Sequence, residues 1–358
     1  MDQKRRSVIV KGAIVLLAVG LAAGFLFFHK TRPLRPTVCD RTGRPLLTDS
    51  RKFLSAEPVR RAQCGGRFAA ALLGHTVVKD GRRIGVGGVE YLIDRRDLKG
   101  KRLLLTLDAG IQEKCETLLD RINENAAPQY VHITVLDADG ALIAAAQRPV
   151  IDLNDRGKVD PRGTVFMAST YVFPIPDAWM RLLGSRSDAP PEEKLKFGFH
   201  RKTGLFPGEG RGVIPGADPQ HIGNGGAGNH AQSATALNFL LAYVGAMERK
   251  PTPEPKLFLP DVAPRPGLRI AGETQWRSLR WSKDRSTLSA LGTAPVQGDA
   301  ELYILLRMVF PRTLPADYRV VLEKMLRNYP GALSGVDYLT LQEMITDFSS
   351  DAKPAANP

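Results

Sequence analysis

The stretch YVHITVLDADGALIAAAQRP, residues 130–149, decides the fold class of this chain. Two apolar runs flank an Asp-Ala-Asp-Gly sequence, and this pattern predicts two strands joined by a tight turn. The preceding stretch, 102–122, predicts a strand at 102–107 and then a helix whose N-cap is Asp108, since apolar residues recur there at helical spacing. A hairpin beside an amphipathic helix indicates a mixed α/β chain.

Further segments extend this pattern on both sides. TVCDRTGRPLLT, residues 37–48, predicts a second hairpin around an Asp-x-x-Gly turn, and TALNFLLAYVGAME, residues 235–248, predicts a buried helix. AELYILLRMVF, residues 300–310, suits a central strand, with a helix as the alternative. The Pro-rich segment 251–265 is expected to be a loop, and 350–358 a disordered tail.

The positive charge of the chain is concentrated at its N-terminus. The 358 residues carry a formal net charge of +13, of which residues 1–61 contribute +9 from 13 basic and 4 acidic side chains. No basic helix or groove with interleaved aromatic residues follows. The charge pattern therefore argues against binding to nucleic acid.

The first thirty residues predict a membrane anchor. A Lys-Arg-Arg head precedes an apolar run, and residues 7–28 are long enough to cross a hydrocarbon layer of about 30 Å if Lys11 reaches back to the headgroups. Residues 1–6 would remain cytoplasmic and the rest of the chain would be exported. A cleaved signal peptide is the alternative, although the run ends in Phe27 and Phe28 and not in an Ala-x-Ala site.

The cysteines and histidines indicate neither a metal site nor a cofactor. Cys39 and Cys64 could form a disulfide in an oxidising compartment, which would leave Cys115 unpaired. The three cysteines lack Cys-x-x-Cys spacing, and the six histidines are scattered without the spacing of metal ligands.

Taken in order, several segments resemble the class B penicillin-binding proteins, the monofunctional D,D-transpeptidases that cross-link peptidoglycan during elongation and division. The matching segments run from about residue 38 to about residue 312. They are CDRTGRPLL (39–47), GVGGVEYLIDRRDLKG (85–100), LLLTLDAGIQ (103–112), VLDADGALIAAAQRPVIDLN (135–154), FGFHRKTGLFPGEGRGVIP (197–215) and NGGAGNHAQSATALNFLLAYVGAMERK (224–250).

The resemblance implies an architecture for the whole chain. It implies an α/β (α+β) fold with a transmembrane helix at 7–28, and a linker and small β-rich membrane-proximal module at 29–100. A transpeptidase-like domain, an antiparallel sheet flanked by helices, would occupy 101–349. The expected location is the bacterial cytoplasmic membrane, with the bulk of the chain outside the cytoplasm.

The family needs a Lys-Thr-Gly strand, whose cation anchors a carboxylate and whose edge pairs with the peptide. The triplet Lys202-Thr203-Gly204 lies too early in the chain and is interpreted as part of a structural loop. The segment in the expected place is SALGTAPVQGD, residues 289–299, in which Ala290 and Leu291 replace Lys and Thr, while Gly292 and Thr293 remain.

The family also needs a serine with a lysine one helical turn later, and a Ser-x-Asn motif. In one alignment Thr164 takes the place of the nucleophile and Met167 that of the base, and methionine cannot accept a proton. In another, Ser169 and Tyr171 take the places of Ser and Asn, although Ser169 would also suit a helix cap or a core hydroxyl. No other Ser-x-x-Lys lies in a plausible place.

These losses favour a pseudo-transpeptidase with a scaffolding or regulatory role among the membrane proteins of wall synthesis or division. Two alternatives stay open. The first is a divergent active transpeptidase that uses Thr164 or Ser169, and the second is a non-catalytic module that binds peptidoglycan stem peptides. Candidate substrate-groove residues are Glu209, Gly292 and Thr293.

Overall fold

The computed structural model describes residues 35–50, 60–63, 66–80, 82–98, 102–153, 165–186, 188–216, 232–261, 263–298 and 300–328. The predicted anchor at 7–28 and the predicted tail at 350–358 lie outside these ranges. No helix among the described residues is both long and apolar enough to cross a membrane.

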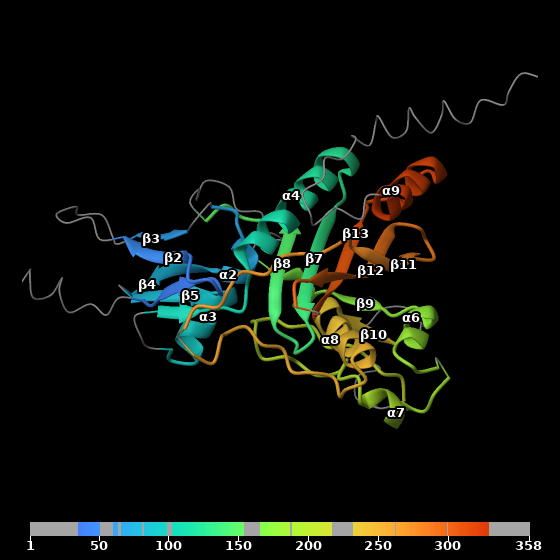
Figure 1. The fold of residues 1–358 in the computed structure, drawn as a ribbon, viewed down its shortest axis with the longest axis horizontal. Helices are drawn as coiled ribbons and strands as arrows, with labels where there is room; N and C mark the ends of the chain where they lie inside the picture. Colours follow the sequence, from blue (N-terminus) through green and yellow to red (C-terminus); the bar gives the residue numbers. More distant parts are fainter. Residues whose placement is uncertain are drawn as a thin grey trace, which may run out of the picture.

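A five-stranded antiparallel sheet forms the centre of the molecule (Figure 1). Its order is β11 (Gln275–Trp281), β12 (Thr287–Val296), β13 (Ala300–Val309), β7 (Tyr130–Asp137) and β8 (Leu142–Arg148). The hairpin predicted at 130–149 is β7–β8, and β13 confirms the strand prediction for 300–310. β13 is the middle strand because β12 and β7 pair with its two sides.

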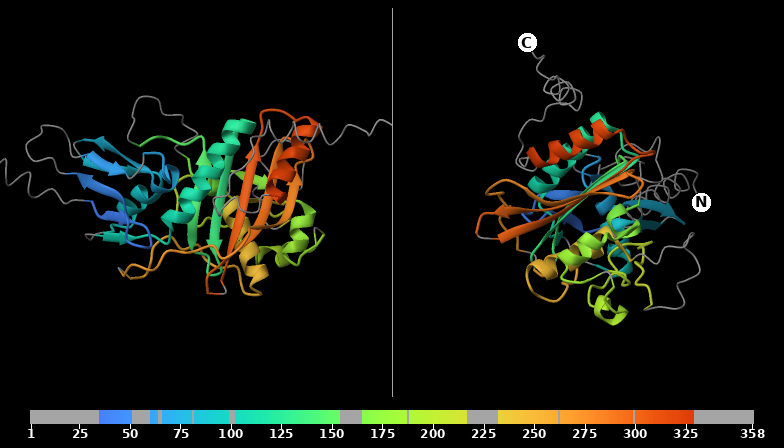
Figure 2. Two further views of the ribbon diagram at one scale, coloured as in Figure 1. Left: turned by 45° about the horizontal axis from the view of Figure 1, so that its top comes forward. Right: turned by 90° about the vertical axis from the view of Figure 1, so that its right-hand side faces the viewer.

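Helices cover both faces of this sheet (Figure 2). Val131, Ile133 and Val135 of β7 pack in one hydrophobic cluster with α4 (Ala109–Ala126) and α9 (Ala316–Asn328). The intervening residues of β7 face the other side, where Leu136 packs with α8 (Ala236–Met247). This alternation follows from the two-residue period of a strand, and it gives the sheet an α4 face and an α8 face.

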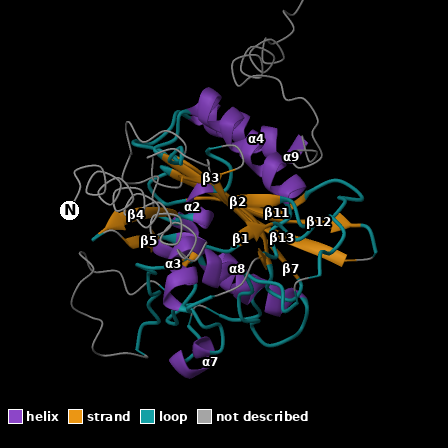
Figure 3. Cartoon of the chain, turned by 90° about the vertical axis from the view of Figure 1, so that its left-hand side faces the viewer, coloured by secondary structure: helices purple, strands orange, loops and turns teal. Residues whose placement is uncertain are grey.

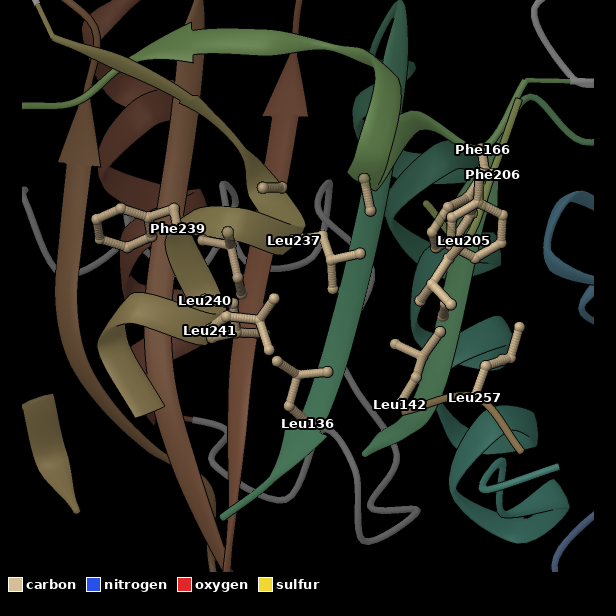
Figure 4. Close-up of a cluster of buried hydrophobic side chains, with 14 of the residues drawn as sticks. Leu136, Leu142, Phe166, Leu205, Phe206, Leu237, Phe239, Leu240, Leu241 and Leu257 are labelled. Carbon is tan, nitrogen blue, oxygen red and sulfur yellow. The ribbon is translucent and has the colours of Figure 1, made fainter. Parts of the chain in front are cut away.

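Helix α8 is the predicted buried helix. The side chain of Thr235 caps it by accepting a hydrogen bond from the backbone N–H of Asn238 at 3.2 Å. Its first ten residues are all buried, and Leu237, Leu240 and Leu241 pack in one hydrophobic cluster with Leu136 and Leu142 of the sheet (Figure 4). A helix that is apolar all round is expected to be enclosed in this way.

The N-terminal region is a smaller β-rich unit (Figure 3). One sheet has the order β3 (Arg60–Gln63), β2 (Pro45–Ser50), β1 (Thr37–Cys39) and β6 (Arg102–Leu104). The hairpin predicted at 37–48 is β1–β2. The remaining elements of the unit are β4 (His75–Lys79), β5 (Arg82–Val86), α2 (Ala70–Leu73) and α3 (Gly88–Arg95).

Strand β6 links this unit to the rest of the chain. It pairs in parallel with β1, although the sequence assigns residues 102–107 to the entry of the second domain. The sheet of the N-terminal unit therefore extends across the predicted boundary at residue 100.

Short elements lie between β8 and α8. They are α5 (Met167–Thr170), β9 (Val172–Pro174), α6 (Asp177–Leu182), α7 (Pro191–Leu195) and β10 (Ser233–Thr235), and β9 pairs with β10. Pro174 and Pro176 separate α5 from α6, as expected for residues that lack a backbone N–H.

A group of polar residues that are buried, or half-buried in the case of Glu116, joins the N-terminal unit, α4 and β8. We call Asp40, Asp108, Gln112, Glu116 and Arg148 the scaffold network. The carboxylate of Asp108 accepts from the N–H groups of Gly110 at 3.0 Å and Ile111 at 3.1 Å, which confirms the predicted cap, and from Leu268 at 2.6 Å.

The rest of the scaffold network is equally well partnered. Gln112 donates to the carbonyl of Ala145 at 3.0 Å and accepts from its N–H at 2.7 Å, which fixes α4 to β8. Arg148 pairs with Glu116 at 2.5 Å and with Asp120 at 2.6 Å. Asp40 accepts from the N–H groups of the turn that follows β1. Every charged member therefore has a partner, which buried charges require.

Cys39 and Cys115 are free, buried thiols. The sulfur of Cys39 accepts a hydrogen bond from Arg102 at 3.3 Å. Cys64, the partner that the sequence allows for Cys39 in a disulfide, lies outside the described residues.

Candidate functional site

The first candidate position for acylation chemistry is the start of α5. Thr164 lies outside the described residues. Met167, the first residue of α5, is fully buried, and its N–H donates to the side-chain oxygen of Gln147 at 3.0 Å. A buried thioether in the position of the expected base cannot take a proton from a hydroxyl.

Ser169 lies in the same short helix, with an exposed fraction of 2%. Its hydroxyl donates to the carbonyl of Phe166 at 3.3 Å, three residues earlier in the chain. Its own carbonyl accepts from the N–H of Gly210 at 3.0 Å, which ties α5 to the loop before β10. The hydroxyl is thus a buried group hydrogen-bonded within its own turn of chain, which is the core-hydroxyl alternative given for Ser169 in the sequence.

Tyr171 follows α5 and stacks on Tyr130 at the start of β7, with ring centroids 5.2 Å apart. Burial raises the pKa of Tyr130. The Asn of the family motif has an amide with a separate donor and acceptor. Tyr171 has a single phenol hydroxyl in that place, so it cannot supply both groups of the amide.

Beneath this region, four polar side chains follow one another across adjacent strands on the α8 face of the sheet. Gln147, His132, Arg307 and Ser289 are successive register partners on β8, β7, β13 and β12, and we call them the polar row. The guanidinium of Arg307 donates to Ser289 at 3.2 Å and lies 4.0 Å from the ring centroid of Phe173. A cation above an aromatic face gains from the ring quadrupole.

The electrostatics of the polar row are unusual. Burial, with the charge of Arg307 beside it, lowers the pKa of His132 to about 3, so its ring is neutral at pH 7. Neither ring nitrogen of His132 has a hydrogen-bond partner among the described residues. Burial also lowers the pKa of Arg307 to about 10. A histidine with so low a pKa is a weak base near neutral pH, so the row does not provide an efficient general base.

The segment expected to carry the Lys-Thr-Gly function lies in β12, which is paired on both sides. Ala290 is the register partner of Leu279 on β11 and of Leu306 on β13. Ala290 and Leu291 are fully buried in the two hydrophobic clusters on opposite faces of the sheet. The expectation that 289–294 offers an edge to a peptide is wrong, because both edges of β12 are already occupied.

Gly292 and Thr293 are interior residues of the same strand. A Cβ atom at Gly292 would lie 2.8 Å from the carbonyl oxygen of Gln275 and 2.9 Å from the ring of Trp276, so this glycine permits close packing of β11. Thr293 has an exposed fraction of 1% and accepts a long hydrogen bond of 3.4 Å from Arg277. Neither residue lines an open groove.

Strand β11 is one of the two edge strands of the sheet, with β8 at the other edge, and it carries a cation and a hydroxyl that were not predicted from the sequence. Arg277 is exposed and lies at an irregularity in the pairing between β11 and β12. Ser278 follows it, and its oxygen accepts from the indole N–H of Trp179 at 2.9 Å. The sequence places the lost cation at Ala290, whereas Arg277 lies on the neighbouring strand β11. The Arg-Ser order in TQWRSLRW, residues 274–281, was the available signal.

Lys202, Thr203 and Gly204 lie in a loop, as the sequence predicts, and Glu209 closes it. The carboxylate of Glu209 accepts from the hydroxyl of Thr203 and from the N–H groups of Gly204 at 2.9 Å, Leu205 at 3.1 Å and Phe206 at 3.0 Å. With an exposed fraction of 6%, this carboxylate shapes the loop and is not free to hold a substrate.

Metal ligands and a second Ser-x-x-Lys spacing are the other possible sources of catalytic chemistry. Within the described ranges, no cluster of three or more His, Cys, Asp or Glu residues could hold a metal ion. One Ser-x-x-Lys spacing, Ser350 and Lys353, occurs in the segment predicted as a disordered tail, and it lies outside those ranges.

Comparisons with known proteins show the fold. No protein-family model matches the sequence, and no curated protein matches it. The structure is similar to the crystal structure of penicillin-binding protein 3 from Mycobacterium tuberculosis in its apo form, with a TM-score of 0.57 and 14% sequence identity. The match covers 91% of this chain and 98% of the other. The chain therefore has a penicillin-binding-protein-like transpeptidase fold.

Proposed function

We propose that this protein is a membrane-anchored pseudo-transpeptidase of the class B penicillin-binding-protein type, with a scaffolding or regulatory role in peptidoglycan synthesis or division. The main support for this proposal is the environment of the side chains in α5. The hydroxyl of Ser169 is buried and bonded to its own helix, and a methionine stands where the family has its base. Acyl transfer by serine needs a hydroxyl that a neighbouring base can deprotonate.

The scaffold network, in which the buried polar groups are hydrogen-bonded, supports a scaffolding role that depends on a stable fold. The scaffold network keeps hydrogen-bonded partners for Asp108, Gln112 and Arg148 across three parts of the chain. A protein that acts by presenting surfaces needs a stable fold and needs no reactive serine.

One observation favours non-catalytic binding of peptidoglycan stem peptides as a second candidate function. Edge strand β11 leaves one side unpaired among the described strands, and Arg277 is exposed on it. An edge strand can accept an extended peptide as an additional strand, and a guanidinium can hold a terminal carboxylate. This arrangement would allow binding without acyl transfer. A divergent active enzyme that uses Thr164 is the remaining alternative.

A complementation experiment separates the pseudoenzyme from the divergent enzyme. Cells that depend on this protein would receive the double variant Thr164→Ala/Ser169→Ala, with the Asp108→Ala variant as a control that weakens the fold. The proposal expects the double variant to support growth and cell shape as well as the unchanged chain does. Loss of function in a double variant that accumulates to the normal level would overturn it.

The scaffolding role needs its own test. Membrane proteins of wall synthesis would be captured with the full chain and with a variant whose residues 1–30 are replaced by an unrelated membrane anchor. Recovery of the same proteins by both chains would support a partner surface in the extracytoplasmic part. An empty capture in both cases would contradict the role.

A further inference from the structure

A cavity of about 960 Å³ opens beside the C-terminal half of α8, away from the polar row. Five segments of the chain contribute to it, and they are the end of α3, Leu183 after α6, residues 196–205, helix α8, and residues 249–258. Figure 1 shows α3, α8 and the connection after α8 along the same edge of the molecule. Its volume lies within the range of small-molecule sites.

The walls of this cavity are strongly basic. The arginines are Arg96, Arg201 and Arg249, and the lysines are Lys196, Lys202, Lys250 and Lys256. Glu254 is the one carboxylate among the described residues that line it, so the lining carries a formal charge of +6. All seven cationic side chains are exposed. Such a concentration of one charge sign in a concave surface attracts counter-ions.

Five of these cations form no ion pair with a described residue. The exceptions are Lys250, which is 3.6 Å from Glu248, and Lys196, which is 3.8 Å from Glu193. Exposed pairs of this length contribute little to stability. Cations near the C-terminus of α8 interact favourably with the negative end of the helix dipole. This effect explains the positions of Arg249 and Lys250 only. The other cations come from separate elements and need another explanation.

The backbone beneath these side chains is fixed. The side-chain amide of Asn238 on α8 donates to the carbonyl of Arg201 at 2.7 Å. The N–H of Lys256 donates to Gly140, and its carbonyl accepts from Leu142, both at 2.9 Å. The hydroxyl of Thr252 donates to the carbonyl of Lys196 at 3.2 Å. Fixed positions lower the entropy cost of gathering several cations around one ligand.

One wall of the cavity is apolar. Leu205, Leu241 and Leu257 lie there, and Figure 4 shows them coming from the loop, the helix and the following connection. Phe197 and Phe258 extend this wall. A site with a cationic rim and an apolar wall suits a ligand that has both a dense negative charge and a hydrocarbon or aromatic part.

We propose that this cavity binds an organic phosphate or diphosphate that carries an apolar group. A phosphate matches the three guanidinium groups, each of which can bind its oxygens through two N–H donors. A single carboxylate would balance one of the six excess charges. The ligand could be a soluble phosphate ester or a lipid headgroup, since both present the same chemistry. This site is independent of the proposed loss of acyl transfer.

The test is a calorimetric titration of the full chain in an uncharged detergent. The probes are inorganic pyrophosphate, dihexanoyl phosphatidic acid, dihexanoyl phosphatidylcholine as the zwitterionic control, and a peptide of eight glutamates. The proposal expects binding of pyrophosphate or phosphatidic acid that weakens as salt is added. Tighter binding of phosphatidic acid than of pyrophosphate assigns the site to a lipid headgroup. The reverse order assigns it to a soluble phosphate.

Two matched variants locate the binding. Arg201→Gln/Arg249→Gln/Lys256→Gln removes one cation from each of three segments and is expected to weaken binding at least tenfold. Lys283→Gln/Arg285→Gln/Arg312→Gln removes three exposed cations outside the cavity and is expected to change it less than threefold. If the first variant does not fold, Lys202→Gln/Lys256→Gln replaces it.

The proposal is overturned if neither phosphate probe binds, if the two triple variants bind them equally, or if the glutamate peptide alone binds. The last result would assign the cavity to an acidic protein segment. None of these outcomes depends on whether the chain transfers acyl groups, so failure here leaves the proposed function standing.

Discussion

Gln147 and Arg148 are neighbours on β8, yet they belong to two regions that differ in how completely their buried polar groups are paired. Arg148 is part of the scaffold network and pairs with two carboxylates, whereas Gln147 begins the polar row that contains His132 and Arg307. His132 has no hydrogen-bond partner among the described residues, and the guanidinium of Arg307 donates to a hydroxyl and lies over an aromatic ring.

The scaffold network stabilises the fold, whereas the polar row does not. Buried polar atoms with partners contribute to stability and to a unique fold, whereas partnerless ones cost free energy. Such costs are common at catalytic sites, where they are offset by function. In this chain the costly row is closed, since His132 has an exposed fraction of 1%. The comparison therefore supports the proposal of a fold that keeps its framework without acyl-transfer chemistry.

The largest expected effect comes from breaking the scaffold network at Arg148. Arg148→Met would leave Glu116, which is 12% exposed, without its cation, and we expect a loss of about 3–5 kcal/mol in the free energy of unfolding. Urea unfolding of the full chain in an uncharged detergent measures it. Arg186→Met is the matched control, because Arg186 pairs with Asp188 in full exposure. Its expected change in the free energy of unfolding is much smaller than that of Arg148→Met, because exposed ion pairs contribute little, and equal losses would contradict the comparison.

The next effect is the loss of the cap of α4. Asp108→Ala removes the acceptor for the N–H groups of Gly110, Ile111 and Leu268, and we expect a loss of about 2–3 kcal/mol. The same urea titration checks it, with Asp139→Ala on the exposed turn of the β7–β8 hairpin as the control. An unchanged midpoint for Asp108→Ala would show that the network does not stabilise the fold.

The hairpins, the cap and the two long apolar elements could be predicted from the sequence because they depend on local signals. Turn residues at 137–140, the cap at Asp108 and the continuous apolar character of α8 each act within a few residues. The order of the strands could not be predicted in this way. It depends on pairing between residues far apart, and it places β11 at the edge and β12 inside.

The same limit explains the error in the candidate site. Gly292 and Thr293 match the letters of the family motif, but the pairing of β12 on both sides decides what they can do. Arg277 lies in a strand whose pairing is irregular and whose burial pattern does not alternate regularly, so its edge position carried a weak signal. The burial of Ser169 also depends on long-range contacts, including the loop at Gly210.

A smaller effect concerns the pH dependence of stability at the polar row. His132 has a pKa of about 3 in the folded chain and an ordinary value of 6.5, so the unfolded chain binds one more proton between these values. Stability therefore falls as pH falls from about 6.5 toward 3, by at most about 1.4 kcal/mol per pH unit from this group. His132→Leu should flatten that fall in unfolding free energies measured from pH 7 to pH 4. An unchanged slope would show that His132 is not buried as described.

The smallest effect is expected at Ser169. The carbonyl of Phe166 that receives its hydroxyl also accepts from the N–H of Ser169 at 3.2 Å, so Ser169→Ala leaves no acceptor without a partner. We expect a change below about 1 kcal/mol in thermal or urea unfolding. A loss as large as that of Asp108→Ala would mean that this hydroxyl belongs to the maintained framework.

The proposed absence of acylation chemistry is tested by the intact mass of the full chain after incubation with a penicillin. An active penicillin-binding protein in the same mixture serves as the positive control, since a penicillin acylates a reactive serine. We predict that the mass of this chain stays unchanged while the control gains one penicillin. A stoichiometric adduct on this chain that disappears in Thr164→Ala, Ser169→Ala or Ser350→Ala would contradict the account.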